Sequence, residues 1–354
     1  MHKIGVIGYG HIGRAIYRLL SNAGYPVTAY DSYYTRTPSD PANVVKIPDY
    51  SANCFDQPVR DNDVIVVATP YHCNVDIADV CSRNHKVYFD MTEDVHVTAA
   101  VHGLFTQSNG TCMTQCGLAP GAVSVIAADL ARHFNNGVIS DVEIRVGALP
   151  VDSNNVLKYH LSWSPEGLVN EYSNRCHAIQ DYRQVELEPL EGYERLVLDG
   201  VEYEAFNTSG GIGSLMEMFA DGSGTYTVQN VNYKTMRYLG HHDKMSFLLK
   251  DLHLQDRKDV LVDILKGALP YIDSDIVVIF VEVTGHVNGK RVVKQYRKKI
   301  YNTDSMSAIQ LTTASGLCTA VHWYCETQPT GILYNHMINN LDTNPFWSVY
   351  REEK

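Results

Sequence analysis

A glycine motif near the N-terminus constrains the fold more than any other feature of this sequence. Residues 3–7 predict a short buried strand, and Gly8, Gly10 and Gly13 follow it at once. Residues 14–20 then show the apolar spacing of a helix. A strand, a glycine turn and a helix in this order are typical of a Rossmann unit that binds a dinucleotide.

Each glycine of this motif has a separate task in such a turn. Gly8 allows the chain to turn tightly, Gly10 lets the backbone approach a pyrophosphate, and Gly13 lets the helix pack on the strand. His11 and Ile12 then present free N–H groups and the positive end of the helix. We therefore expect these five residues to bind the phosphates of the cofactor.

The end of the next strand predicts which dinucleotide is bound. A second strand over residues 26–30 ends at Asp31, 18 residues after Gly13. A carboxylate there accepts hydrogen bonds from the ribose hydroxyls and repels a 2′-phosphate, so the sequence favours NAD over NADP. Two alternatives remain open: Asp31 could merely cap a turn, and Arg36 could soften the discrimination.

Strands and helices go on alternating to about residue 121. The strand predicted over residues 63–68 is apolar along its length, as in a parallel sheet covered on both faces. The further predictions are helices over 75–84, 95–108 and 122–133 and strands over 86–90 and 111–116. Such repeats predict an α/β fold with a Rossmann doubly wound parallel sheet.

Three loops follow strands of this predicted sheet. Ligands of open parallel sheets bind beyond the carboxyl ends of the strands. We therefore expect the loops at residues 68–72, 90–94 and 116–121 to converge where a nicotinamide would lie. The first loop supplies three more expected cofactor contacts, Ala68, Thr69 and Pro70.

Each of these loops also has a simpler interpretation. Tyr71 and His72 could begin a helix. Glu93 and Asp94 could cap one. Cys116 could be a small buried hydrophobic residue rather than a reactive thiol.

From about residue 141 the pattern changes to alternating apolar and polar residues. The predicted strands span 141–146, 155–163, 184–189, 195–198, 203–206 and 275–283, and the predicted helices span 164–174, 215–219 and 257–265. Asn288 and Gly289 predict a tight hairpin because both tolerate positive φ. The basic residues 290–299 favour a solvated outer face over an anion site. We expect a second α+β domain built on a mainly antiparallel sheet.

The helical spacing returns over residues 305–324, with small residues that suit close packing on the first domain. The predicted dinucleotide-binding domain therefore comprises residues 1–121 and about 305–354. Residues 122–304 form the predicted substrate and dimerisation domain.

The composition excludes some function classes. Lys and Arg total 29 against 40 for Asp and Glu, a net charge of −11, which disfavours nucleic-acid and anionic-membrane partners. No apolar run is long enough to cross a bilayer, so we expect a cytoplasmic protein. The eight cysteines are scattered without C-x-x-C spacing, and we expect neither disulfides nor a metal site.

Four segments together point to a family. They are residues 116–121 (CGLAPG), 159–167 (YHLSWSPEG), 206–211 (FNTSGG) and 233–241 (YKTMRYLGH). In this order, behind a Rossmann start, they resemble the saccharopine dehydrogenase (reductase) and lysine 6-dehydrogenase superfamily from about residue 3 to 320. The chain differs from common relatives at Ala119, at Leu239 and over residues 327–354.

The resemblance implies a site and an oligomer. It implies oxidation at a carbon that bears nitrogen and a homodimer formed through the second domain. It places six residues at the border of the substrate site, namely Tyr71, Cys116, Trp163, Ser164, Arg237 and His241. With the strand-end loops and the candidate bases added, the predicted catalytic residues are Tyr71, Asp90 and Cys116, and the predicted substrate-binding residues are Glu93, His160, Trp163, Ser164, Arg237 and His241. Four groups stay open as the proton acceptor, namely Asp90, Glu93, His72 and His160.

The resulting functional hypothesis is an NAD(P)-dependent oxidoreductase of an amino-acid CH–NH or CH–NH2 group, of the lysine 6-dehydrogenase or saccharopine dehydrogenase type. Charges near the second motif are balanced, with Glu166 and Glu171 against Lys158 and Arg175. A basic or ordinary amino acid therefore fits better than saccharopine, which carries three carboxylates. The alternatives are a polyamine-pathway reductase of the carboxynorspermidine or homospermidine synthase type and a non-catalytic NAD-binding sensor.

Overall fold

The computed structural model describes residues 1–35, 41–134, 138–220 and 227–352. Arg36, which could soften the choice of cofactor, lies outside the described residues. The chain divides into two compact units. The first unit contains Met1–Ala122 and Gln310–Arg351, and the second contains Val123–Ile309 and Glu352–Lys354.

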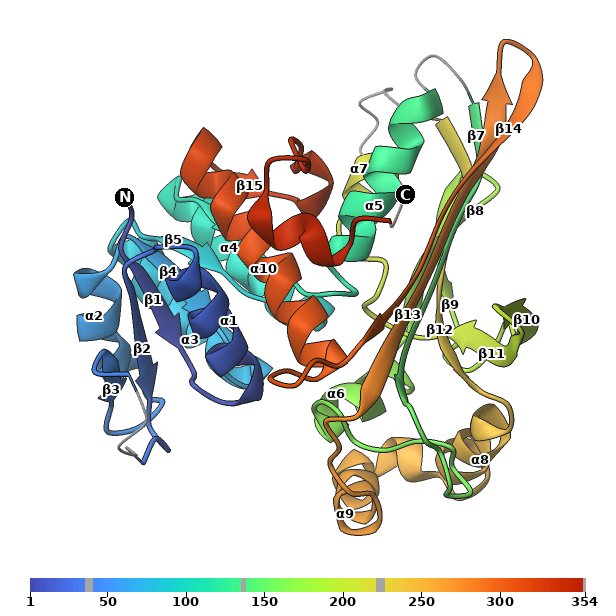
Figure 1. Cartoon of the computed structure of the whole chain (residues 1–354), viewed down its shortest axis with the longest axis horizontal. Coiled ribbons are helices and arrows are strands. Elements are labelled where there is room, and N and C mark those ends of the chain that lie inside the picture. The colour runs from blue at the N-terminus through green and yellow to red at the C-terminus, as the bar shows by residue number, and fades with distance from the viewer. Residues whose placement is uncertain (36–40, 135–137, 221–226, 353–354) are drawn as a thin grey trace. The chain divides into compact units, whose positions relative to one another are not determined.

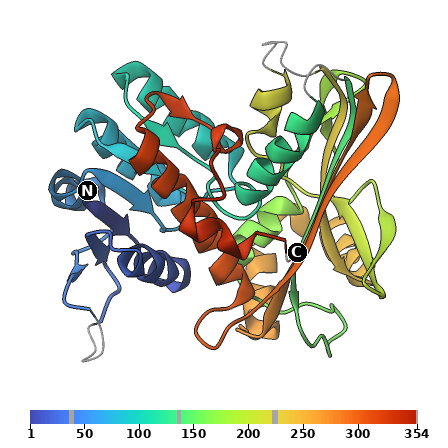
Figure 2. The same cartoon turned by 45° about the horizontal axis from the view of Figure 1, so that its top comes forward.

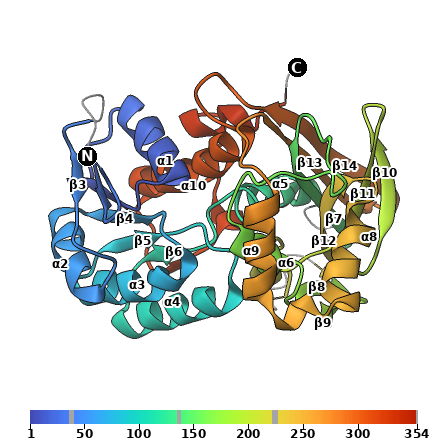
Figure 3. The same ribbon diagram turned by 90° about the horizontal axis from the view of Figure 1, so that it is seen from below.

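The first unit is built on one sheet of seven strands, and all of its pairings are parallel. Its spatial order is β15 (Ile332–Leu333), β6 (Cys112–Met113), β5 (Val87–Phe89), β4 (Val64–Val67), β1 (Ile4–Ile7), β2 (Val27–Asp31) and β3 (Val44–Lys46). The helices are α1 (His11–Asn22), α2 (Ala52–Asp61), α3 (Asn74–Arg83), α4 (Val95–Ser108) and α10 (Ala308–Thr327). Figure 3 shows α1 and α10 on one face and α2, α3 and α4 on the other. The predicted Rossmann sheet is confirmed.

The central strands are apolar throughout because both of their faces are covered. On one face, Ile65 and Val67 of β4 join a buried cluster with Phe55 of α2, Ile77 of α3 and Phe105 of α4. All four residues of β4 are buried. Burial on two faces explains why this strand shows no alternation in the sequence.

The last strand of the parallel sheet comes from the end of the chain. After α10 the chain returns to place β15 beside β6, with Ile332 opposite Cys112 (Figure 2). The side-chain amide of Asn335 donates hydrogen bonds to the carbonyls of Thr114 (3.2 Å) and Gln115 (3.1 Å). The sequence predicts no element here, because a two-residue strand carries no periodicity.

The second unit is built on a mixed sheet of eight strands (Figure 1). Its main order is β10 (Glu194–Leu198), β11 (Val201–Asn207), β12 (Thr227–Tyr238), β7 (Val138–Pro150), β13 (Asp275–Val287) and β14 (Lys290–Tyr301). Two further strands, β8 (Cys176–Gln180) and β9 (Arg183–Leu187), extend it from β12. Only β7 and β12 pair in parallel among these strands. The predicted α+β domain on a mainly antiparallel sheet is confirmed.

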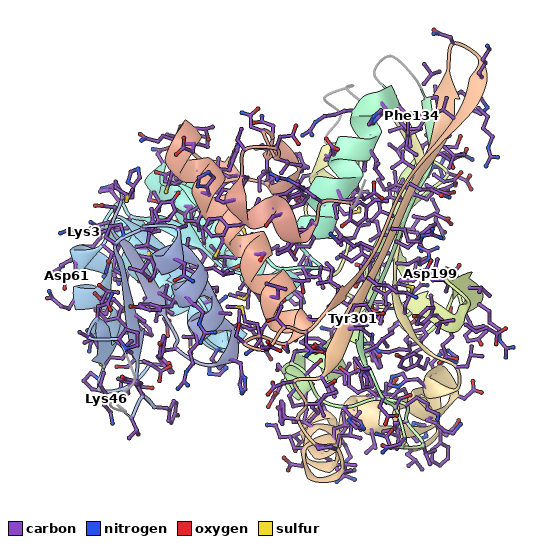
Figure 4. The ribbon with its side chains drawn as sticks, in the orientation of Figure 1. Lys3, Lys46, Asp61, Phe134, Asp199 and Tyr301 are labelled. Carbon is purple, nitrogen blue, oxygen red and sulfur yellow. The ribbon has the colours of Figure 1, made fainter. Side chains whose placement is uncertain are left out.

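Besides the first residues of α10, eight helices or helical turns belong to the described part of the second unit or begin at its boundary. They are α5 (Ala122–Ala131), a 3-10 turn (Arg132–Phe134), α6 (Pro165–Glu171), α7 (Leu215–Ala220), α8 (His241–Ser246), a π-helical turn (Phe247–Asp251), a second 3-10 turn (Leu254–Asp256) and α9 (Lys258–Ala268). Asp199, at the turn between β10 and β11 (Figure 4), forms ion pairs with Arg297 and Lys299 of β14. These ion pairs connect the β10–β11 hairpin to β14, the strand at the opposite end of the sheet order.

The structure confirms one local prediction in this unit and contradicts another. Asn288 and Gly289 have φ of 52° and 73° and connect β13 to β14, as predicted. The strand predicted over residues 155–163 is wrong, because Leu161 alone forms a single bridge, to Tyr271. Positive φ at Lys158 (54°) interrupts the extended run that the sequence pattern had indicated. Among the helices that the structure describes, none combines the length and the apolar character needed to cross a bilayer.

Candidate functional site

In the turn between β1 and α1, two of the three glycines have no room for a side chain. Gly8 has a φ of 98°, and a Cβ there would lie 2.5 Å from the carbonyl oxygen of Ala68 at the end of β4. A Cβ at Gly13 would overlap the carbonyl oxygen of Gly8. Any side chain at either position would force backbone atoms apart, so only glycine fits.

The third glycine faces open space. A Cβ at Gly10 would meet no atom within 4 Å, and Gly10 is the residue that precedes α1. Gly10 has no side chain that could cap this helix end, so within the described residues the first N–H groups of α1, at His11 and Ile12, stay available to a ligand. Open space, free donors and the positive end of a helix dipole together fit the pyrophosphate of a dinucleotide.

Asp31 ties the end of β2 to this turn. Its carboxylate accepts hydrogen bonds from the backbone N–H groups of Tyr9 (2.7 Å) and Tyr33 (2.7 Å). The bond to Tyr33, two residues away, is a turn cap, which is the simpler of the two roles expected for Asp31. The bond to Tyr9 is different, because it holds the carboxylate beside the glycine turn, where the ribose of a bound dinucleotide would lie.

The loop after β4 passes directly into a helix. Ala68 and Thr69 are half-buried, and Pro70 is exposed. Tyr71 and His72 form a 3-10 turn, Tyr71–Cys73, that leads into α3. Both residues therefore begin a helix, and the predicted role of the half-buried Tyr71 in catalysis stays a prediction.

The loop after β5 contains a fully buried carboxylate. Asp90 is 0% exposed, and its two oxygens accept four hydrogen bonds. The donors are the hydroxyl of Tyr88 (2.8 Å), the amide of Asn74 (3.1 Å) and the backbone N–H groups of Thr92 (3.2 Å) and Gln115 (3.0 Å). In this structure Asp90 is sealed from solvent and its hydrogen-bonding capacity is used within the protein, while its catalytic role stays a prediction. Its hydrogen bonds join α3, β5 and the end of β6.

The next two acidic residues differ from each other. Asp94 caps α4, since its carboxylate accepts from the N–H of Val97 (2.9 Å). Glu93 is half-buried, and burial raises the pKa of its carboxyl, with further raising by the nearby charges of Asp94 and Asp90. The capping interpretation thus holds for Asp94 and not for Glu93.

Cys116, after β6, is sealed in the same way as Asp90. Its side chain is fully buried and makes weak contacts to the carbonyls of Met113 (3.6 Å) and Thr114 (3.5 Å), and it also contacts the side chain of Asn335. Burial raises the pKa of the thiol well above its ordinary value. Burial therefore disfavours a reactive thiolate and suits the simpler interpretation of Cys116 as a small buried hydrophobic residue, while its catalytic role stays a prediction.

The second unit contains a buried cluster around Arg237 of β12. This side chain is 2% exposed, and its Nε donates to the hydroxyl of Tyr172 (2.8 Å). Its Nη1 donates to the carbonyl of Met236 (2.9 Å), and the guanidinium lies 5.1 Å from the ring centre of Tyr159. The cation is thus held between aromatic rings.

His241 closes the cluster on the other side of Tyr172. Its Nδ1 lies 2.8 Å from the carbonyl of Leu157, which only accepts, so Nδ1 carries the proton. Its Nε2 therefore accepts from the hydroxyl of Tyr172 at 3.1 Å. Burial first, and then the charge of Arg237, lower the pKa of His241 to about 3. His241 is neutral at physiological pH, and a directed hydrogen-bond chain runs from Arg237 through Tyr172 to His241.

The other predicted substrate residues lie around this cluster with different roles. The indole N–H of Trp163 donates to the hydroxyl of Tyr159 (3.0 Å), which connects Trp163 to the cluster. Ser164 caps α6 by accepting from the N–H of Gly167 (3.1 Å), so its local role is structural. His160 is half-buried, and its Nδ1 has no hydrogen-bond partner in the part of the chain that the structure describes.

The sequence did not single out Tyr159 and Tyr172 as members of the cluster around Arg237. Tyr159 stands inside the quoted motif at residues 159–167, so the motif itself could have indicated it. Tyr172 has no local signal, because its partner Arg237 is 65 residues away. The resemblance thus predicted that Trp163, Arg237 and His241 lie near one another, but it did not include Tyr172, which links Arg237 to His241.

Known proteins match both parts of the chain. Residues 117–346 match the model of the saccharopine dehydrogenase C-terminal domain. Residues 1–75 match the NAD-binding domain of D-isomer specific 2-hydroxyacid dehydrogenases. Together with the glycine turn, the second match identifies an NAD(P)-binding domain of the dehydrogenase type.

The fold is shared with a solved structure. Apo saccharopine dehydrogenase (L-Glu forming) from Saccharomyces cerevisiae is 15% identical, with 95% of this chain and 94% of that chain covered and a TM-score of 0.73. A weaker match is the DAP dehydrogenase of C. glutamicum in complex with DAP, which is 12% identical, with 96% of this chain and 97% of that chain covered and a TM-score of 0.47. Since the match to the saccharopine dehydrogenase C-terminal domain covers more than half of the 354 residues, the chain belongs to the saccharopine dehydrogenase family.

Proposed function

We propose that this protein is an NAD-dependent dehydrogenase that oxidises the carbon bearing nitrogen in an amino acid. One observation carries the proposal: an open glycine turn at Gly10 occurs in a chain whose residues 117–346 match the saccharopine dehydrogenase C-terminal domain. When bound, a nicotinamide supplies a two-electron acceptor for a hydride. The protein would contribute binding, orientation and proton transfer.

The choice of NAD over NADP rests on Asp31. Its carboxylate is fixed by Tyr9 and Tyr33 beside the glycine turn. A fixed negative charge there supports binding of ribose hydroxyls and opposes a 2′-phosphate.

The choice of an amino acid rests on Arg237. Its Nε donates to Tyr172 and its Nη1 to Met236, and the charge of the buried Glu171 also acts on the guanidinium. A carboxylate is the acceptor that best matches a buried guanidinium edge. A single such arginine supports an ordinary or basic amino acid over the three carboxylates of saccharopine, and it disfavours a polyamine.

The test is a substrate panel read by the absorbance of the reduced nicotinamide. The panel contains lysine, ordinary amino acids, saccharopine and polyamines, each with NAD and with NADP. We expect turnover of an amino acid with NAD and little turnover with NADP. Gly10→Val, purified in the same way, is the control, because it should retain the fold and show no turnover.

The other outcomes separate the alternatives. Turnover of saccharopine but not of lysine would overturn the preference for a basic or ordinary amino acid. Turnover of polyamines alone would favour the polyamine-pathway reductase. Tight NADH binding without turnover of any member of the panel would favour the non-catalytic sensor.

A further inference from the structure

We propose that Glu93 is the proton acceptor of this site, an inference that rests on the proposed function. Glu93 lies in the loop after β5, at the carboxyl end of the parallel sheet. This edge also carries the glycine turn after β1 and the loop after β4. A ligand that enters the sheet edge at the glycine turn would therefore pass within reach of this loop.

The three carboxylates of the loop have different tasks. Asp90 accepts four hydrogen bonds and is sealed from solvent. Asp94 caps α4 through the N–H of Val97. In the described chain, Glu93 has no hydrogen-bond donor to its carboxylate other than its own backbone N–H. It is therefore the one carboxylate of this loop with no part in holding the fold together.

The surroundings of Glu93 suit proton transfer. It is half-buried, and burial together with the charges of Asp94 and Asp90 raises the pKa of its carboxyl. A base works best when its pKa is near the pH at which the reaction runs. The raised pKa of Glu93 moves its carboxyl in the direction that a base needs, and its oxygens keep room for a proton, whereas both oxygens of Asp90 are already occupied by hydrogen bonds.

In the proposed reaction, proton transfer to Glu93 comes before loss of the hydride. An N–H bond of the substrate ammonium breaks, its proton moves to a carboxylate oxygen of Glu93, and the electron pair stays on nitrogen. The substrate carbon next to that nitrogen then loses a hydride, with the nicotinamide as the two-electron oxidant, and the nitrogen lone pair forms the C=N bond. Water adds to this carbon in the final step, with release of the nitrogen as an amine or ammonia.

The first experiment needs no turnover. The protein is treated near neutral pH with a water-soluble carbodiimide and glycine ethyl ester, with and without NADH, and the modified carboxyls are mapped by mass spectrometry. We expect Glu93 to be modified and Asp90 to be protected throughout. NADH at about ten times its Kd should slow the modification of Glu93 about tenfold. Modification of Glu93 at the same rate with and without NADH would overturn the inference.

The second experiment compares two variants that each remove one neighbouring charge. Glu93→Gln should lower kcat about 100-fold or more, while KM and the Kd of NADH change little. Asp94→Asn is the matched control, since asparagine also caps helices, and it should keep kcat within a few-fold of the native protein. Glu93→Asp should restore part of the rate lost in Glu93→Gln, and all three variants should keep the native Tm.

The outcomes separate the two proposals. Equal loss of kcat in Glu93→Gln and Asp94→Asn would overturn the role of Glu93 and leave the proposed function intact. An inactive native protein would overturn the proposed function. In that case the modification experiment still decides whether Glu93 faces the bound cofactor.

Discussion

The glycine turn of the first unit and the Arg237 cluster of the second are both intolerant of change, but they are built in opposite ways. The turn consists of backbone atoms from residues 8–13 and is open at Gly10. The cluster consists of side chains that come from residues 159–241 and is almost closed to solvent.

The difference shows what each region responds to. A backbone turn has no charge to alter, so it responds to added volume, and its response depends on which glycine is replaced. A buried cluster of charge and aromatic rings responds to protonation, because the low dielectric around it makes any new charge costly. Substitutions and pH can therefore probe the two regions separately.

The largest effect is expected from Gly13→Val. The added Cβ overlaps the carbonyl oxygen of Gly8, so the backbone of the turn must move. We expect a loss of about 3 kcal/mol or more in the free energy of unfolding, measured by urea denaturation. A native-like midpoint would show that the turn can relax and that volume does not limit it.

The second effect is on binding alone. In Gly10→Val the new side chain enters open space, so the free energy of unfolding should stay within about 0.5 kcal/mol of the native value. The same side chain fills the space proposed for the pyrophosphate, so NADH binding should weaken about 100-fold or more, measured by titration of NADH fluorescence. Native affinity in this variant would mean that the phosphates bind elsewhere.

The third effect probes the Arg237 cluster through pH. His241 has a folded pKa of about 3 against an ordinary value of 6.5, so the unfolded chain takes up the proton first as the pH falls. Its contribution is full above about pH 6.5 and is lost progressively toward pH 3. From about pH 7 to about pH 5 the native protein should lose about 2 kcal/mol more than His241→Gln, measured by urea denaturation at each pH. Parallel pH curves for the two proteins would contradict a neutral, sealed His241.

The smallest effect concerns cofactor choice. Asp31→Asn removes the negative charge but keeps an oxygen that can accept from Tyr9 or Tyr33. The ratio of the Kd of NADP to that of NAD should fall about tenfold, which is about 1.4 kcal/mol. Equal weakening of both cofactors would assign Asp31 to holding the turn and not to binding the ribose.

The two regions also differ in how well the sequence predicts them. The strand, Gly8, Gly10, Gly13 and Asp31 lie within a short stretch, and their spacing carries the geometry. The sequence therefore predicted the parallel sheet and the open glycine. It did not reveal that Asp90 and Cys116 are fully buried, because burial depends on packing by distant elements.

The second unit shows the same limit. The apolar run of β13 and the Asn288–Gly289 turn identified a hairpin correctly. Alternation failed over residues 155–163, where Lys158 turns the chain, and it missed β12, whose parallel partner β7 is far away in the sequence. Local patterns find hairpins, whereas pairings over long sequence separations need the fold.

The pairing of β15 with β6 has a consequence for the synthesis of this protein. A ribosome makes β6 at residues 112–113 and must add about two hundred residues, including the whole of the second unit, before Ile332 exists. Until then the edge of β6 is open, and open edges pair with other chains. The nascent first unit should therefore depend on chaperones for longer than the second, whose strands β7 to β14 emerge in one continuous run.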